Sequence, residues 1–190
     1  MTLCFATNNH HKLTEVAALL GDAFTLKTLA DIGCTEELPE TTDTIPGNSH
    51  QKADYVWRHY GIDCFADDSG LEIDALNGAP GVHSAYYGGE PRDHGRNIDR
   101  VLRELEDVTR RTARFRTVIT LIREGQVHVF EGVVEGSLTD APRGNGGFGY
   151  DPIFIPEGHD RTFGEMSLEE KSRISHRAQA FGKLVNFLKK

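Results

Sequence analysis

The stretch IDCFADDSGLEIDAL, residues 62–76, decides the fold class of this chain. IDCFA (62–66) is mostly apolar like a buried strand, and LEIDAL (71–76) alternates apolar and polar residues like a half-buried strand. Asp67 and Asp68 lie between these runs, and Ser69-Gly70 favours a turn. We therefore expect two strands, with both aspartates at the carboxyl end of the first, where open α/β sheets bind ligands.

The turn matters because neighbouring side chains inside a strand point to opposite faces of the sheet. At a turn, the carboxylates of Asp67 and Asp68 could serve one ligand. A pair of hard oxygen donors suits Mg²⁺, and bound phosphates and water usually complete its coordination. The alternative is a turn that only solvates the end of a strand. The six residues FADDSG (65–70) alone leave both interpretations open.

The chain before this stretch begins with a strand and a helix. LCFA (3–6) predicts a buried strand, and the helix that follows starts at Asn8 or Asn9 and ends at Gly21. FTLKTL (24–29) predicts a second strand.

Further helices and one hairpin are expected. Asn48 is expected to cap the first of these helices and Gly61 to close it, while the last helix begins at about Ser175. The runs ARFRTVITLIRE and QVHVFEGVVEG are separated near Gly125, which predicts an antiparallel hairpin. The middle helix places four apolar residues on one face: Ile98, Val101, Leu102 and Leu105.

Strand and helix pairs followed by a hairpin predict an α/β fold, in which flanking helices cover a sheet of mixed direction. At 190 residues and 21.1 kDa the chain is long enough for one core and short for two ordinary domains. We expect a single domain over residues 1–190.

Composition and charge exclude several classes of protein. A net charge of −8 and a pI near 5.6 argue against binding a nucleic acid polymer, because phosphate contacts along a duplex need a broad basic face. The N-terminal apolar run is too short for a signal peptide or a membrane span, so we expect a cytoplasmic protein with no membrane partner. Cys4, Cys34 and Cys64 are widely spaced, which predicts free buried thiols.

ATNNHHK (6–12) lies where the first helix begins. The first turn of a helix presents unpaired backbone N–H groups and a positive dipole end to an anion. Thr7 and Asn9 could add donors, and Lys12 a full charge. A capping asparagine with a solvated lysine is the alternative interpretation.

RGNGGFGYDPIF (143–154) contains a literal G-x-G-x-x-G. A dinucleotide-binding loop must open a helix, whereas here Asp151-Pro152 and an apolar run favour extended chain, so that function is excluded. What remains is a glycine-rich loop in which Phe148 could stack on a base, or fold inward as in an ordinary hairpin loop.

SLEEKSRISHRAQ (167–179) begins with a capping box and soon starts a second helix. Lys171, His176 and Arg177 therefore gather at the corner between two helices. Arginine and histidine can donate to carbonyl oxygens on a ligand, or can coat a surface.

Together these segments resemble the inosine triphosphate pyrophosphatase family, also called the Ham1 or noncanonical purine NTP pyrophosphatase family. The resemblance runs from residue 3 to about residue 180 and includes five motifs in the family's order and spacing. The motifs read ATNNHHKLTE, ETTDTIPGNSHQKA, FADDSGLEIDALNGAPGVHSA, GNGGFGYDPIF and EEKSRISHRAQA.

The resemblance implies hydrolysis of ITP, dITP and XTP to the monophosphate and pyrophosphate, which removes deaminated purines from the nucleotide pool. It also implies Mg²⁺ as cofactor, a homodimer, and an elongated, two-lobed domain with a twisted sheet and a central cleft.

The resemblance also implies roles for individual residues. Asp68 looks like the general base, and Glu40, Asp67 and Asp68 look like candidate metal ligands. The residues that resemble the family's substrate contacts are Thr7, Asn8, Asn9, His10, His11, Lys12, Lys52, Ser69, Phe148, Gly149, Tyr150, Asp151, Lys171, His176 and Arg177.

The chemistry is consistent with these roles. Cleavage of a triphosphate between its α and β phosphates needs cations on the attacked phosphate and on the leaving pyrophosphate, and Lys12, Lys52, Lys171 and Mg²⁺ would supply them. Hypoxanthine and xanthine present an O6 acceptor where adenine presents an amino donor. Donors from His176 and Arg177 would therefore favour the deaminated bases.

Several residues depart from the family's pattern. Asn8 stands where glycine is common, and Tyr86 replaces a frequent arginine. Four residues alter the usual E-x-G-x-T-F-x-E-N-A run, and one of them, Gly47, removes a carboxylate. They are Thr42, Ile45, Gly47 and Ser49.

Two other functions compete with this one. A metal-dependent phosphate-ester hydrolase with little base preference would not need the paired His176 and Arg177. A nucleotide-binding module that has lost turnover would not need Asp68 beside Glu40.

Overall fold

The computed structural model describes the backbone of residues 1–190 and every side chain except those of His11, Glu15 and Leu19. Six strands form one sheet in the order β2-β1-β3-β4-β5-β6. β1 is parallel to β2 and β3, and β5 is antiparallel to β6, so the sheet is mixed, as predicted. The strands are β1 (Thr2–Phe5), β2 (Thr25–Lys27), β3 (Cys64–Ile73), β4 (Thr112–Arg123), β5 (Gln126–Leu138) and β6 (Phe154–Pro156).

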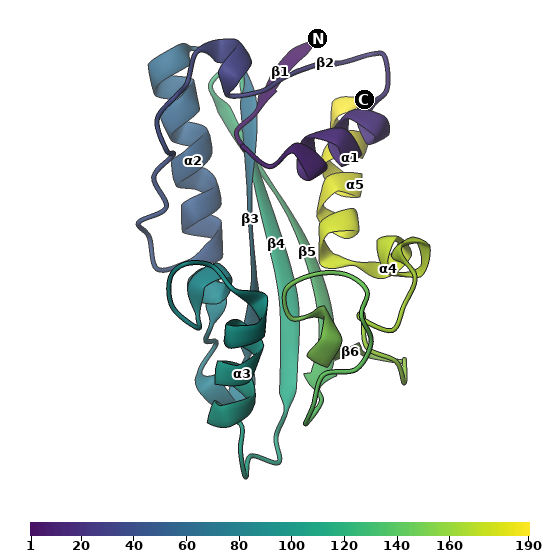
Figure 1. Ribbon diagram of the computed structural model, residues 1–190. Coiled ribbons are helices and arrows are strands. Elements are labelled where there is room, and N and C mark those ends of the chain that lie inside the picture. The colour runs from purple at the N-terminus through teal and green to yellow at the C-terminus, as the bar shows by residue number, and fades with distance from the viewer. The chain divides into compact units, whose positions relative to one another are not determined.

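Five α-helices flank the sheet (Figure 1). They are α1 (His10–Leu20), α2 (Ile45–Tyr60), α3 (His94–Glu104), α4 (Leu168–Ile174) and α5 (His176–Leu188). None of the helices, as far as their residues are described, is long and apolar enough to cross a membrane.

The turn predicted at Ser69-Gly70 is wrong, because β3 runs without a break from Cys64 to Ile73. Apolar side chains on both sides of the aspartates keep the backbone extended: Ala66 precedes them and Leu71 follows, and both are fully buried. Burial in the sheet therefore outweighs the local preference of serine and glycine for a turn. LEIDAL ends this same strand and continues into a 3₁₀ turn at Asp74–Leu76.

The chain divides into two compact units. Unit 1 comprises Met1–Asp68, Thr117–Glu131 and Ala180–Lys190, and unit 2 comprises Ser69–Arg116 and Gly132–Gln179. The division falls inside β3, β4 and β5, so each of these strands contributes to both units.

In unit 1, helices pack on both faces of the sheet. Side chains of α1 and α5 bury Phe5 and Phe65 on one face, where the two rings stack at 4.5 Å. Val56 of α2 buries Cys64 and Ala66 on the other face. Figure 1 shows α2 on the side of the strands opposite to α1 and α5. Within unit 1, the odd residues of β3, Phe65 and Asp67, therefore face α1, and its even residues face α2.

In unit 2, α3 covers one face of the strands. Ile98, Val101 and Leu105 of this helix pack with Leu71 and Ile73 of β3, as their helical spacing predicted. Aromatic rings extend this core: the Phe115 and Phe154 rings lie 4.5 Å apart.

Local turn and capping chemistry is mostly as predicted. The β4–β5 hairpin turns at Glu124 and Gly125, whose φ angles of 51° and 76° are those of a tight hairpin turn. Asn9 caps α1 by accepting from Lys12 N at 3.2 Å, and Gly21 ends that helix with a φ of 69°. The three cysteines are free and buried, as predicted.

Two predicted boundaries are wrong. The N-cap of α2 is Thr44, whose hydroxyl accepts from Gly47 N at 3.0 Å, and not Asn48, which lies buried inside the helix. Pro46 fits the first turn, where its missing N–H is not needed, so the helix can begin earlier. The second strand is also shorter than predicted and covers Thr25–Lys27.

Candidate active site

The start of α1 is built by side chains from the ATNNHHK segment. Asn9 N donates to Thr7 Oγ1 at 3.1 Å, and Asn9 Oδ1 in turn accepts from Lys12 N. Asn8 and His10 are exposed beside this cap, and the side chain of His11 lies outside the described residues. The cap places Lys12 on the first turn of the helix.

Lys12 binds the first aspartate of the pair. Its Nζ lies 2.6 Å from Asp67 Oδ2, and the Asp67 side chain is only 2% exposed. Because residues of β3 alternate between faces, Asp67 lies on the α1 side of the sheet and Asp68 on the α2 side. Asp67 therefore reaches Lys12, while Asp68 projects from the opposite face of the strand.

On the α2 side, the Lys52 ammonium forms an ion pair with the Glu40 carboxylate. Burial lowers the pKa of Lys52, but Asp67, Glu40 and Asp68 together outweigh burial and raise this pKa above its ordinary value. Lys52 thus stays charged among three carboxylates. We call Lys12, Glu40, Lys52, Asp67 and Asp68 the lysine–carboxylate cluster.

The chemistry of this cluster suits a metal that completes its shell with other ligands. No group of three His, Cys, Asp or Glu side chains is arranged to hold a metal among the described residues. Mg²⁺ does not need one, because it is usually held by one or two carboxylates together with phosphates and water. The hard oxygens of Glu40 and Asp68 fit that requirement.

A second set of predicted residues lies in unit 2, around the glycine-rich loop. Asp151 is 2% exposed, and its Oδ2 accepts from Phe148 N at 3.0 Å. Gly147 has a φ of 70°, and a side chain there would overlap the Asp151 carboxylate. Glycine at this position therefore allows the loop to close on Asp151, which leaves the Phe148 ring 50% exposed.

The same carboxylate binds Lys171. Lys171 Nζ lies 2.5 Å from Asp151 Oδ2 and 4.7 Å from the centre of the Phe148 ring. Lys171 comes from α4, whose N-terminus carries the predicted capping box of Ser167 and Glu170. A hydrogen bond from Arg161 and backbone donors at the cap lower the pKa of Glu170 to about 2.

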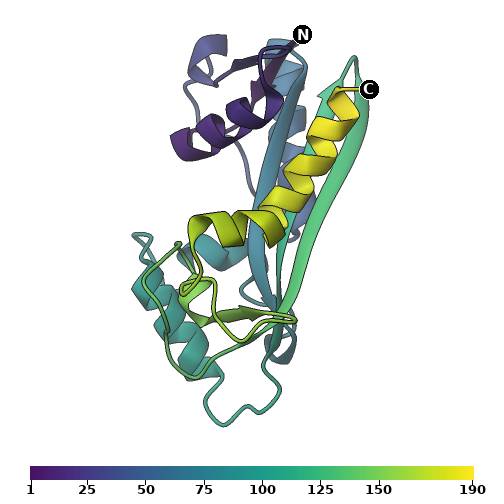
Figure 2. The same ribbon diagram turned by 90° about the vertical axis from the view of Figure 1, so that its right-hand side faces the viewer.

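His176 and Arg177 begin α5, which follows α4 directly in the chain (Figure 2). The His176 ring is 8% exposed and stacks on Phe115, with ring centres 4.9 Å apart. Arg177 Cζ lies 5.3 Å from the Phe148 ring centre. Its Nε is buried and has no hydrogen-bond partner among the described residues. We call Phe115, Phe148, Lys171, His176 and Arg177 the aromatic–cation cluster.

Three further predicted residues are Tyr150, Gly149 and Ser69. Tyr150 is 5% exposed and its hydroxyl donates to Ser84 O at 2.7 Å, while burial raises the pKa of that hydroxyl above its ordinary value. Gly149 has a φ of 61°, which turns the chain after Phe148. Ser69 lies in β3, directly after Asp68.

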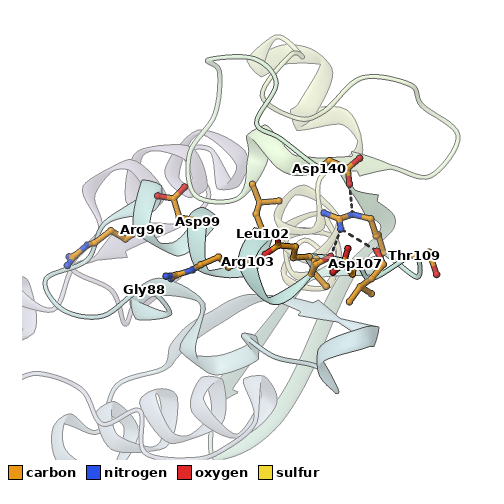
Figure 3. Close-up of a pocket in the computed structure, with 12 residues that line it drawn as sticks. Gly88, Arg96, Asp99, Leu102, Arg103, Asp107, Thr109 and Asp140 are labelled. Carbon is orange, nitrogen blue, oxygen red and sulfur yellow. Dashed lines mark hydrogen bonds and ion pairs between the residues drawn. The ribbon is translucent and has the colours of Figure 1, made fainter.

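A cavity of about 1060 Å³ beside α3 contains none of these residues (Figure 3). Arg111 lies in it, but its guanidinium donates to the backbone oxygens of Leu105, Leu138 and Thr139. The Arg111 charge therefore supports the loops around the cavity, and the predicted site residues lie elsewhere.

The Ham1 family profile matches residues 3–187 of the chain. This chain belongs to the Ham1 family. The sequence resemblance is thereby confirmed.

Relatives match along nearly their whole length. A dITP/XTP pyrophosphatase of Flavobacterium johnsoniae is 50% identical over 188 residues, which cover 99% of this chain and 98% of the relative. A dITP/XTP pyrophosphatase of Porphyromonas gingivalis is 52% identical over 187 residues, which cover 98% of this chain and 96% of the relative. The Ham1 protein of Staphylococcus aureus is 34% identical and superposes with a TM-score of 0.95 over 100% of this chain and 98% of that one.

Two departures from the Ham1 pattern belong together. Thr42 stands where the pattern has glycine, and Gly47 stands where it has glutamate. A side chain at Gly47 would overlap the hydroxyl oxygens of Thr42 and Thr44. Because Thr42 fills this space, Gly47 is the residue that fits it. Tyr86 is 53% exposed, and nothing in the structure explains its replacement of arginine.

Three residues of α2 support the Ham1 motifs in ways that the sequence did not reveal. The Ser49 hydroxyl is fully buried, donates to Ala66 O at 3.0 Å and lies 2.9 Å from Thr120 Oγ1. Asn48 and Gln51 contact the loop that carries Glu40. Polar residues on the buried side of a helix are the signal that could have identified them.

Proposed function

We propose that this protein hydrolyses the triphosphates of deaminated purine nucleosides, ITP, dITP and XTP, to the monophosphate and pyrophosphate. The observation that carries the proposal is the lysine–carboxylate cluster, in which Lys12 and Lys52 lie among the carboxylates of Glu40, Asp67 and Asp68. The curated relatives named dITP/XTP pyrophosphatase support the substrate class. Residues 1–190 are proposed to act as one domain.

The lysines of the cluster serve the phosphates. Lys12 and Lys52 would neutralise charge that builds up on the attacked phosphate and the departing pyrophosphate. Glu40 and Asp68 would hold Mg²⁺, while Asp67 keeps Lys12 in place through its ion pair. Bound Mg²⁺ would add Lewis-acid stabilisation of the phosphate oxygens.

Asp68 is the proposed general base. A water that attacks the α phosphate must lose a proton, and a carboxylate oxygen of Asp68 would accept it. Asp67 forms an ion pair with Lys12, and the charges of both Asp67 and Asp68 act on Lys52, which itself pairs with Glu40. In this proposal Asp68 acts as the general base, and Asp67 holds the ammonium group of Lys12.

The aromatic–cation cluster is proposed to read the base. The half-exposed ring of Phe148 offers a stacking surface. Donors on Arg177 and His176 would satisfy O6 of hypoxanthine or xanthine. Adenine presents an amino group there, so its N–H groups would stay unpaired and binding would weaken. Asp151 and Lys171 fix the loop that carries Phe148.

The test is pyrophosphate release from ITP, XTP, ATP, GTP and CTP, with and without Mg²⁺, by the wild type and by Asp68→Asn. We expect fast release from ITP and XTP only with Mg²⁺, and a loss of about 10³-fold in kcat for the variant. Asp54→Asn, which alters only an ion pair with Arg58 on the surface of α2, is the control. Equal rates for ATP and ITP would favour a broad hydrolase, and bound ITP without turnover would favour a binding module.

Two further properties are part of the proposal. The family resemblance supports a homodimer, which light scattering coupled to size-exclusion chromatography would test. The net charge of −8 supports an enzyme that binds no nucleic acid polymer. A cytoplasmic location without a membrane partner is proposed as well, and fractionation of the source cells would test it.

A further inference from the structure

The segment that carries Glu40 has no regular structure of its own. Residues 35–44 join a 3₁₀ turn to α2 and form neither helix nor strand. Glu40 is half exposed, with 50% of its side chain accessible. A metal ligand on such a segment needs support, because loops without backbone pairing move more than the elements that they connect.

Two residues of α2 supply this support. Thr41 N donates to Gln51 Oε1 at 2.8 Å, and Gln51 Nε2 donates to Thr41 Oγ1 at 2.8 Å. One turn earlier, Asn48 Oδ1 accepts from Thr42 N at 3.0 Å and from Thr42 Oγ1 at 2.8 Å. Four hydrogen bonds thus attach two consecutive residues of the segment to one helix.

The Gln51 contact acts directly on Glu40. The N–H of Thr41 belongs to the peptide group that joins Glu40 to Thr41, and a peptide group is planar. Holding this N–H therefore fixes the orientation of the plane in which the Glu40 carbonyl lies. Lys52, the next residue of α2, binds the Glu40 carboxylate from the same helix. Backbone and side chain of Glu40 are thus held by adjacent residues.

We propose that Gln51 is a positioning residue, whose amide clamps the Glu40–Thr41 peptide and holds the Glu40 carboxylate ready for a divalent cation. This proposal rests on the metal-binding role given to Glu40 above. Gln51 itself touches neither substrate nor metal in it. Ligands are oriented by such outer partners, whose loss typically weakens metal affinity by about 10-fold to 100-fold.

The test uses Mn²⁺ as the probe and the full-length protein. Binding of Mn²⁺ is followed by electron paramagnetic resonance, with and without an ITP analogue that carries an imido bridge between its α and β phosphates. We expect Gln51→Ala to weaken Mn²⁺ binding about tenfold. His50→Ala, an exposed neighbour on the same helix, should leave it unchanged. Thermal melting checks that both variants fold alike.

A double-mutant cycle assigns the effect to the contact with Thr41. Thr41→Val alone removes the hydroxyl partner of Gln51 and should weaken Mn²⁺ binding by a smaller factor. Added to Gln51→Ala, it should cause no further loss, because the interaction is already gone. Fully additive losses would show that the two residues act independently, which would overturn the proposal.

Glu40→Gln separates this proposal from the proposed function. If Glu40→Gln weakens Mn²⁺ binding and Gln51→Ala does not, the clamp is wrong and the metal site stands. If Glu40→Gln leaves Mn²⁺ binding unchanged, Glu40 is no metal ligand, and the assignment on which the clamp rests fails.

Discussion

The lysine–carboxylate cluster and the aromatic–cation cluster each contain an ion pair between a lysine and a carboxylate, but the two pairs differ in exposure. In the lysine–carboxylate cluster, the Lys52–Glu40 pair has one half-exposed partner, so the Glu40 carboxylate is open to a new ligand, while Lys52 and the Lys12–Asp67 pair are largely buried. In the aromatic–cation cluster, the ion pair of Lys171 and Asp151 is buried, with side chains 11% and 4% exposed. That pair supports a loop, and the loop presents the ring of Phe148.

The difference follows from what each cluster is proposed to bind. Phosphates and a divalent cation are charged and hydrated, so their partners need charges that can exchange one ion for another. A purine is flat and nearly neutral, so its partners need a fixed ring and a few directed donors. Removing a charge from the first cluster should therefore affect all triphosphates alike, and changing the second should alter the choice among bases.

The largest effect is expected from Lys52→Met. Loss of a cation that meets the phosphates should lower kcat/KM by about 10²-fold to 10³-fold for ITP, XTP and ATP alike. Pyrophosphate release measures this, with Lys183→Met as control, since Lys183 donates only to Glu131 O. A loss of kcat/KM for only one of the three triphosphates would contradict the assignment of phosphate binding to one cluster and base recognition to the other.

A smaller effect, on selectivity, is expected from Arg177→Met. Its buried Nε has no partner among the described side chains, and a ligand acceptor would complete it. Without the guanidinium, the ratio of kcat/KM for ITP to that for ATP should fall by about thirtyfold. An unchanged ratio, with both rates reduced, would show that Arg177 contacts the phosphates instead.

Phe148→Ala should weaken binding of every base. Stacking on an aromatic ring contributes about 1–3 kcal/mol per base, so KM should rise by about tenfold, with little change in kcat. Phe187→Ala is a control on a second, partly buried phenylalanine in a ring cluster with Phe130. A drop in kcat without a change in KM would contradict the stacking role.

The smallest effect is expected from Glu170→Gln at the N-terminus of α4. The pKa of Glu170 is lowered from 4.5 to about 2 in the folded state, first by Arg161. Its contribution to stability is therefore present above pH 4.5 and is lost as the pH falls toward 2. Urea unfolding across this range should show a shallower pH dependence for the variant.

Arg161→Met supplies the control for that experiment, because it removes the first cause of the lowered pKa. The difference between wild type and Glu170→Gln should shrink in this background. A difference of the same size would mean that the backbone N–H groups of the cap alone hold the charge.

Much of the fold follows from local patterns. The Asn9 cap, the Ser167 box and the hairpin at Gly125 all depend on residues within about four positions of one another, so the sequence predicted them. The unbroken strand β3 did not follow, because the turn preference of Ser69-Gly70 is local, whereas the burial that overrides it comes from distant helices.

The site divides in the same way. Motif order made Lys12, Asp68 and Lys171 candidates, and their roles stay predictions, since the structure shows only the ion pairs of Lys12 with Asp67 and of Lys171 with Asp151. The roles of Ser49 and Gln51 were missed because each depends on a partner outside its own motif pattern: Ala66 lies seventeen residues from Ser49, and Thr41 lies ten from Gln51. Only the packing of α2 shows which of its polar residues are engaged.

The unbroken course of β3 also sets a condition for anyone who wishes to transplant this chemistry. Asp67 and Asp68 owe their opposite directions to the strict alternation of a strand that has a helix on each side. On a surface loop of another scaffold, nothing would keep the two aspartate side chains pointing in opposite directions. A designer would need to copy three layers, helix, strand and helix, and to preserve the register to the residue.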